Sequence, residues 1–138
     1  MCSSPLSAGI IAALGLTGAE EVFEVGTDYG NQTALLARLA ARVVSIGICP
    51  DLAQRARRNL AGQGIGNVLV LAGDGTDGAP DFVPFDAIVV SPPALTCPRH
   101  WPAQLKMGGR LVQFADPGVG KMSCCITRSG TACAGCGP

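Results

Sequence analysis

Short apolar runs alternate with amphipathic segments along most of the chain. Runs rich in β-branched residues predict strands over residues 22–25, 42–48, 68–71 and 85–90. Between them, apolar positions three or four residues apart predict a helix over 32–41, and Pro50-Asp51 starts a second one that ends at Gly62-Gln63-Gly64. Strands that alternate with helices are typical of βαβ units, so we expect an α/β domain with a parallel sheet.

The pattern becomes weaker after the fourth strand. A short helix is expected around Trp101, Gln104 and Leu105, with Pro102 in its first turn. Gly108-Gly109 predicts a turn, residues 110–114 a fifth strand, and residues 122–127 a sixth strand in antiparallel pairing. We therefore expect a domain over residues 1–128, followed by a Gly- and Cys-rich tail over 129–138 that is poorly ordered.

Length and charge narrow the possible functions. The chain has 138 residues, enough for one domain, with ten basic and ten acidic side chains and a formal net charge of 0. This balance gives no electrostatic reason to expect nucleic acid or an anionic membrane as a partner. No basic N-terminal signal and no run of about 18–20 apolar residues is present, so we expect a cytoplasmic protein.

The cysteines raise the question of a metal site. In the cytoplasm the seven cysteines would be reduced thiols rather than a disulfide framework. Four of them could in principle ligate zinc: Cys124, Cys125, Cys133 and Cys136. Adjacent cysteines on a strand point to opposite faces, which hinders common coordination, so we expect no metal.

Candidate chemistry lies in the turns that follow the strands. In open parallel sheets, ligands bind beyond the carboxyl ends of the strands, which here carry the segments 24–30, 47–51, 73–75 and 91–93. The helix that starts near Gly30 would direct backbone N–H groups at a ligand anion. Asp74 could accept a hydrogen bond from an adenine amino group, although an aspartate between two glycines more often caps its own turn.

Five segments, in order and spacing, resemble the protein-L-isoaspartate O-methyltransferases between Ser3 and Arg128. They are residues 24–27 (EVGT), 32–37 (QTALLA), 73–75 (GDG), 84–88 (PFDAI) and 104–112 (QLKMGGRLV). The resemblance implies a class I methyltransferase fold, which is a Rossmann-like three-layer sandwich with a mostly parallel sheet. It also implies S-adenosylmethionine as the methyl donor and, in protein repair, an isoaspartyl carboxylate of a protein or peptide as the acceptor.

The resemblance also assigns site residues. Those expected to border the methionine and ribose moieties of the cofactor are Glu24, Gly26, Thr27, Gly30, Gln32 and Thr33. Asp74 and Gly75 would lie beside the adenine. Ser3-Ser4-Pro5 is similar to the family's Ser-Gln-Pro segment, whose serine is the active-site residue, so Ser3 is the expected catalytic residue. For His100, the only histidine, we expect an ordinary surface or capping role.

The chain departs from the family pattern at three places. Asp28 replaces the second glycine of the first turn, and Gly47 replaces the acidic residue that holds the ribose hydroxyls. Loss of that acceptor would weaken cofactor binding roughly 10- to 150-fold, unless Asp28 or Asp51 substitutes. The family has more chain at both ends, so the sheet here would lack its last strand.

These departures keep two alternatives open. One is an enzyme of the same family that methylates an aspartate in a modified peptide or another small carboxylate. The other is a degenerate or truncated paralogue with no turnover that serves as a binding or interaction module. Restoring Glu at position 47 and Gly at position 28 would separate decay at these two positions from the lack of substrate-binding and sheet elements.

Overall fold

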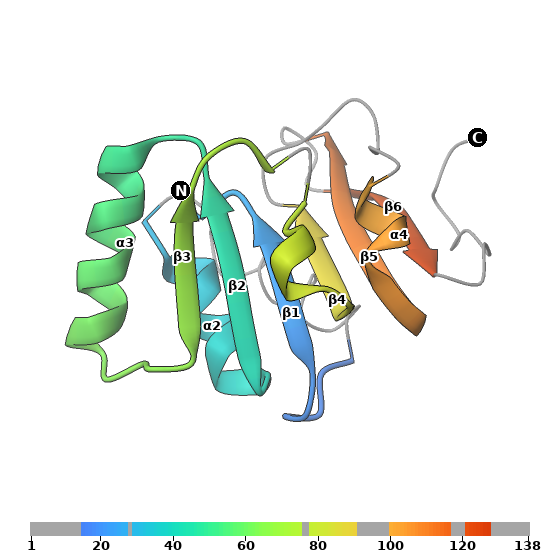
Figure 1. Cartoon of the computed structure of the whole chain (residues 1–138), viewed down its shortest axis with the longest axis horizontal. Helices are drawn as coiled ribbons and strands as arrows, with labels where there is room; N and C mark the ends of the chain where they lie inside the picture. Colours follow the sequence, from blue (N-terminus) through green and yellow to red (C-terminus); the bar gives the residue numbers. More distant parts are fainter. Residues whose placement is uncertain (1–14, 28, 76–77, 91–99, 117–120, 128–138) are drawn as a thin grey trace.

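The computed structural model describes residues 15–27, 29–75, 78–90, 100–116 and 121–127 (Figure 1). The strands are β1 (Glu21–Val25), β2 (Arg42–Gly47), β3 (Val68–Ala72), β4 (Phe85–Val90), β5 (Leu105–Asp116) and β6 (Lys121–Thr127). The helices are α2 (Asn31–Leu39), α3 (Pro50–Gly62), the short 3-10 helix η2 (Pro80–Phe82) and α4 (His100–Ala103).

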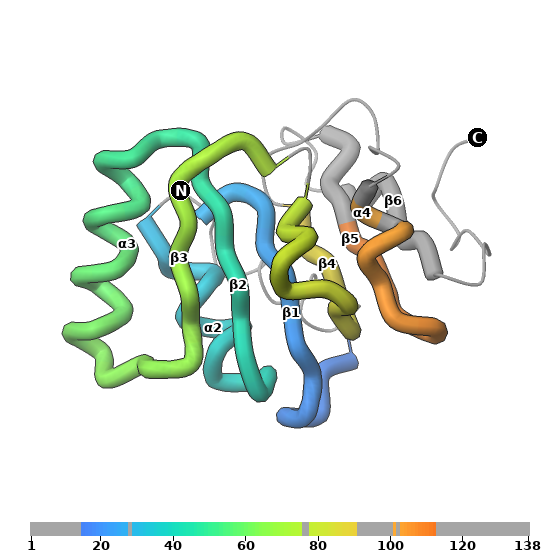
Figure 2. Tube along the Cα trace, in the orientation of Figure 1, coloured from blue at the N-terminus to red at the C-terminus, as the bar shows by residue number. Residues whose placement is uncertain are grey.

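All six strands form one sheet in the order β3-β2-β1-β4-β5-β6. The first five are parallel and β6 runs antiparallel to β5, as the sequence predicts. Figure 2 shows the chain winding from β1 outward to β3 and then returning to β4 on the other side of β1. The strand order therefore reverses between β1 and β4, which is where open α/β sheets bind ligands.

Apolar side chains cover both faces of the sheet. One core cluster joins α2 to the strands through Leu36, Val22, Val43 and Val89, and α3 extends this layer over β3 through Leu60 and Val70. The opposite face carries a second cluster beneath η2 and α4. In that cluster the Phe23 and Phe85 rings stack with centroids 5.1 Å apart. The described helices thus form layers on both sides of the sheet.

The segment around Trp101 differs from the prediction. Gln104 and Leu105 were expected in a helix, but α4 ends at Ala103 and Leu105 begins β5. The Gln104 N–H donates to Trp101 O at 3.1 Å, which closes a turn, and the Phe85 N–H donates to Gln104 O at 2.8 Å. Pairing with β4 therefore takes over from the helix at Gln104.

The expected turn at Gly108-Gly109 is also wrong, because β5 continues through it. Leu105 pairs with Phe85 and Arg110 with Ala87, so more residues lie between the two pairs on β5 than on β4. The extra residues form a bulge in which Gly108 has φ 81°, a value that suits glycine. The two glycines thus bend a strand instead of ending it.

Candidate functional site

The turn after β1, the end of β2 and the loop after β3 come together at the carboxyl edge of the sheet. A Cβ added at Gly75, in the loop after β3, would lie 2.7 Å from Val25 Cγ1 and 3.0 Å from Ile46 Cγ2. A Cβ at Gly47 would lie 3.3 Å from Thr27 Oγ1. The lack of a side chain at positions 47 and 75 lets these three segments approach one another this closely.

The turn after β1 depends on two glycines with positive φ. Gly26 has φ 103°, and its N–H donates to Ile46 O at 2.8 Å. Gly30 has φ 87° as the N-cap of α2, and its N–H donates to Thr27 O at 2.9 Å. The first N–H groups of the nine-residue α2 follow this turn, and such groups favour an anion.

Glu24 is the centre of a buried polar network behind this turn. Its side chain is 0% exposed, yet three side-chain donors satisfy its carboxylate. Gln32 Nε2 donates to Oε2 at 3.0 Å, while Thr33 Oγ1 and Ser45 Oγ donate to Oε1, the latter at 2.7 Å. Ser45 Oγ also lies 2.6 Å from Thr27 Oγ1. The network therefore ties β1, β2, the turn and the first turn of α2 into one unit.

One atom of this network is left over. Gln32 is 5% exposed, and within the part of the chain that the structure describes its Oε1 has no hydrogen-bond partner. Leaving a buried acceptor unpaired costs about 1–3 kcal/mol. Gln32 Oε1 is therefore an acceptor that suits a donor group of a ligand bound at the turn.

The loop after β3 is attached to both sides of the sheet edge. The Gly73 N–H donates to Gly47 O at 2.9 Å, and Gly75 O accepts from Trp101 Nε1 at 2.8 Å. Asp74 stands exposed between the two glycines. The backbone on each side of Asp74 is thus fixed by contacts with the ends of β2 and α4.

Most of the predicted site residues are brought together. Glu24, Gly26, Thr27, Gly30, Gln32 and Thr33 form one unit, and the packing of Gly75 on Val25 brings the loop after β3 beside it. Ser3 and Asp28 lie outside the described residues, as do the tail cysteines. Sequence reasoning missed Ser45. A lone hydroxyl in the apolar run Val43-Val44-Ser45-Ile46, paired in register with Glu24, was the available signal.

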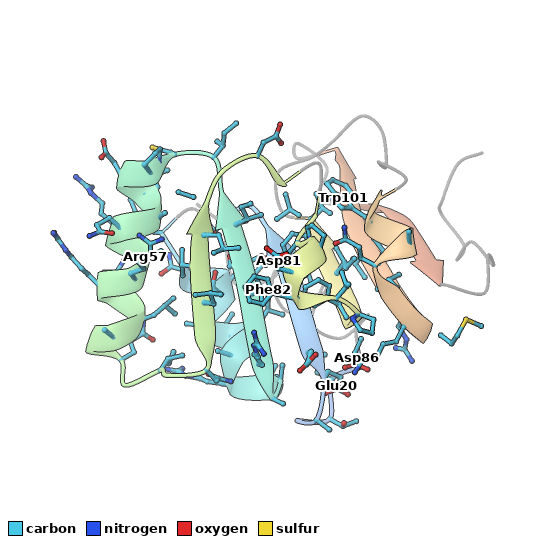
Figure 3. The ribbon with its side chains drawn as sticks, in the orientation of Figure 1. Glu20, Arg57, Asp81, Phe82, Asp86 and Trp101 are labelled. Atoms are coloured by element: carbon cyan, nitrogen blue, oxygen red, sulfur yellow. The ribbon has the colours of Figure 1, made fainter. Side chains whose placement is uncertain are left out.

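Polar groups also gather at the opposite, amino-terminal edge of the sheet (Figure 3). Asp86 accepts from the Glu21 N–H at 2.8 Å and pairs with Lys106 at 3.2 Å. Glu20 is partly desolvated, which would raise its pKa, but hydrogen bonds from Thr17, Gly18 and its own N–H outweigh this and lower the pKa from 4.5. This edge is far from the converging loops, so these charges organise strand starts.

The described residues show neither a membrane-spanning helix nor a cluster of metal ligands. Among them, no helix combines the length and the apolar character that crossing a membrane requires. Nor do the described residues contain a group of three or more His, Cys, Asp or Glu side chains placed to hold a metal ion. The side chains of the candidate zinc cysteines are not among those that the structure describes, so the expectation of no metal stays a prediction.

Comparison with known proteins assigns this chain to a family. The model of the family "Protein-L-isoaspartate(D-aspartate) O-methyltransferase" matches residues 1–127. The protein-L-isoaspartate O-methyltransferase of Methanoculleus marisnigri is 49% identical over 98 residues, which are 71% of this chain and 44% of that protein. That of Anaeromyxobacter dehalogenans is 54% identical over 101 residues, 72% and 48% of the two proteins. The chain thus spans about half the length of these curated relatives.

Solved structures agree on the fold. A protein-L-isoaspartate O-methyltransferase superposes with a TM-score of 0.82 and 30% identity, covering 92% of this chain and 42% of that one. A precorrin 8w decarboxylase, at 24% identity and a TM-score of 0.73, covers 82% of this chain and 63% of its own and shares the fold alone. The predicted class I methyltransferase fold is confirmed, and the chain belongs to the protein-L-isoaspartate(D-aspartate) O-methyltransferase family.

Proposed function

We propose that this chain takes part in S-adenosylmethionine-dependent methylation of an isoaspartyl or aspartyl carboxylate in a protein or peptide. The observation that carries this proposal is the convergence of the Gly26–Gly30 turn and the Gly75 loop beside the buried Glu24 network. This convergence lies beside the point where strand order reverses. Membership of the family supplies the reaction class.

The amino-acid end of S-adenosylmethionine fits the turn after β1. Its carboxylate is an anion, and the first N–H groups of α2, which no side-chain cap hydrogen bond satisfies, suit an anion. Its ammonium group is a donor, and Gln32 Oε1 is a buried acceptor without a partner among the described residues. Glu24 and Thr33, both 0% exposed, would hold this end by fixing the turn.

The ribose end of S-adenosylmethionine fits the end of β2 less well. Gly47 is buried against Thr27 at the end of β2 and has no side chain with which to accept from ribose hydroxyls. Asp51, exposed in the first turn of α3, is the nearest acidic residue along the chain after that strand. We therefore propose that the chain binds the cofactor at this edge with lower affinity than a relative carrying an acidic residue at position 47.

Little acid–base machinery is required for the transfer. When bound, S-adenosylmethionine would supply a sulfonium methyl group, which a carboxylate accepts as a methyl ester while the C–S bond breaks and its electron pair stays on sulfur. An acceptor carboxylate is already ionised at pH 7, so the chain has to orient it and exclude water. Ser3 is our proposed residue at the acceptor, on the strength of the family resemblance.

Protein or peptide chains are the partners that this function requires. The formal net charge of 0 gives no reason to add nucleic acid or a membrane surface. The cytoplasmic location expected from the sequence stays a prediction.

Methyl transfer can be measured directly with matched peptides. The chain is incubated with methyl-labelled S-adenosylmethionine and either an isoaspartyl peptide or the same peptide with a normal aspartyl residue. We expect a base-labile methyl ester on the isoaspartyl peptide, and less of it with Ser3→Ala. Absence of ester on both peptides, from a chain that binds the cofactor, would refute turnover and leave a binding module.

A further inference from the structure

The segment between β4 and β5 holds the loop after β3 at two points. Trp101 Nε1, from α4, donates to Gly75 O at 2.8 Å. The Ala79 N–H donates to Oε1 of Gln104, the residue between α4 and β5, at 2.9 Å. Both side chains are buried, with Trp101 2% and Gln104 9% exposed. One contact donates to the loop and the other accepts from it, so the loop is held at Gly75 and at Ala79.

The fit between this loop and Gln104 is close. Gly78 has φ 72°, and a Cβ added there would lie 2.2 Å from Gln104 Oε1. The Gly78 N–H donates to Gly75 O at 3.0 Å, so this carbonyl accepts from the loop itself and from Trp101. The loop therefore closes on itself against the Gln104 amide.

The same loop is in contact with the cofactor side of the sheet. Gly75 packs against Val25 and Ile46 so closely that a Cβ would lie 2.7 Å and 3.0 Å from their side chains. Val25 directly precedes Gly26, the first residue of the turn that the cofactor would approach. A displacement of Gly75 would therefore move Asp74 and press on the ends of β1 and β2.

We infer that Trp101 and Gln104 are positioning residues, which hold the Asp74–Gly75 segment in the arrangement that the adenine side of the cofactor requires. Neither touches the reacting atoms. This inference rests on the proposed function, because the benefit of a fixed loop is tighter cofactor binding. Trp101 is the only tryptophan in the chain and comes after β4, so it links that part of the chain to the cofactor loop. Figure 3 labels it at the carboxyl side of β4.

A purely structural tryptophan is the competing explanation, because the ring belongs to the core cluster that includes Phe85 and Leu111. Trp101→Phe separates the two readings. Phenylalanine keeps an aromatic ring in the core but cannot donate to Gly75 O. Gln104→Leu removes the acceptor of the Ala79 N–H while keeping a side chain of similar size. A matched control is Val112→Ala, which removes methyl groups from the buried cluster on the opposite face of the sheet.

The first measurement needs no cofactor. Amide hydrogen exchange of the unliganded chain should be about five-fold faster over residues 73–79 in Trp101→Phe and in Gln104→Leu, which is the effect of about 1 kcal/mol. Exchange in β2 and α3 should stay within two-fold of the unmodified chain. We expect Val112→Ala to speed exchange uniformly along the chain. The same uniform increase in Trp101→Phe and Gln104→Leu would overturn the inference. If Trp101→Phe fails to fold, Gln104→Leu alone decides the outcome.

The second measurement is cofactor affinity. Both variants should raise the Kd for S-adenosylmethionine about five-fold and leave kcat at saturating cofactor unchanged, whereas Val112→Ala should leave Kd unchanged. An unchanged Kd in both variants would overturn the inference. If the unmodified chain binds no cofactor, the proposed function fails, and the inference fails with it as a statement about binding. The exchange measurement still decides whether the two residues hold the loop.

Discussion

Ser45 donates a hydrogen bond to the Glu24 carboxylate across two adjacent parallel strands, with 2.7 Å between Oγ and Oε1. The same hydroxyl lies 2.6 Å from Thr27 Oγ1, in the turn that follows β1. A carboxylate with no solvent exposure is tolerated because Gln32, Thr33 and Ser45 donate hydrogen bonds to it. The hydrogen-bond network that holds the site together thus lies beneath the surface that a ligand would touch.

Loss of the Glu24 carboxylate should lower the free energy of unfolding more than loss of a single donor does. Glu24→Ala leaves buried donors on Gln32, Thr33 and Ser45 without their acceptor, at about 1–3 kcal/mol each. Ser45→Ala removes one hydrogen bond to a charged group, worth about 1.5–3 kcal/mol, and one with the Thr27 hydroxyl, worth about 0.5–1.5 kcal/mol. Urea unfolding should therefore give the larger loss of unfolding free energy for Glu24→Ala. The reverse order would contradict the role of Glu24 as the shared acceptor.

A methyl group at Gly75 should damage the site by crowding. In Gly75→Ala the new Cβ would lie 2.7 Å from Val25 Cγ1, and overpacking of this kind costs about 1–3 kcal/mol. Gly62→Ala is the matched control, because a Cβ there meets nothing within 4 Å and alanine favours the helix. Thermal unfolding should separate the two, with Tm lowered only by Gly75→Ala. Equal Tm values would argue against close contact between the loops.

An acidic side chain at position 47 should improve cofactor binding. A Cβ at this position approaches Thr27 Cβ and Oγ1 at 3.3 Å, so Thr27 has to shift by a few tenths of an ångström. Gly47→Glu should lower the Kd for S-adenosylmethionine by roughly 10- to 150-fold through charge-assisted hydrogen bonds to ribose. Gly47→Ala isolates the steric part and should not gain affinity. A gain in Gly47→Ala equal to that in Gly47→Glu would contradict the electrostatic explanation.

Acid should remove the contribution of Glu20 to stability. Hydrogen bonds from Thr17 and Gly18 lower the pKa of Glu20 in the folded chain below its ordinary 4.5. The unfolded chain then binds this proton more readily, so the stabilisation is complete above pH 4.5 and is lost as the pH falls through the folded pKa. Unfolding free energies between pH 3 and pH 6 should fall less steeply for Glu20→Gln. Parallel curves would show that Glu20 contributes nothing.

Local pattern was sufficient for the regular part of the fold. The strand predicted over residues 85–90 has those bounds, because its continuous apolar run suits burial on both faces. The helix around Gln104 was wrong because pairing of Leu105 with Phe85 overrides a weak helical pattern. The local spacing of apolar residues does not predict tertiary pairing of this kind.

The site was predictable as a set of residues, but their roles were less so. The family resemblance pointed to Glu24, Gln32 and Thr33, and the structure shows them bonded to one another rather than open to solvent. Ser45 and Trp101 were missed because each depends on contact between elements distant in sequence. Trp101, for example, contacts Gly75 across 26 positions.

The turn after β1, the end of β2 and the loop after β3 are proposed to bind S-adenosylmethionine, and isothermal titration of the chain with this compound tests this most directly. We expect a saturable heat with one molecule bound per chain. S-adenosylhomocysteine should compete for the same site, and Gly47→Glu should bind S-adenosylmethionine with a lower Kd. Absence of heat and of saturation at millimolar S-adenosylmethionine, from folded protein, would contradict the account.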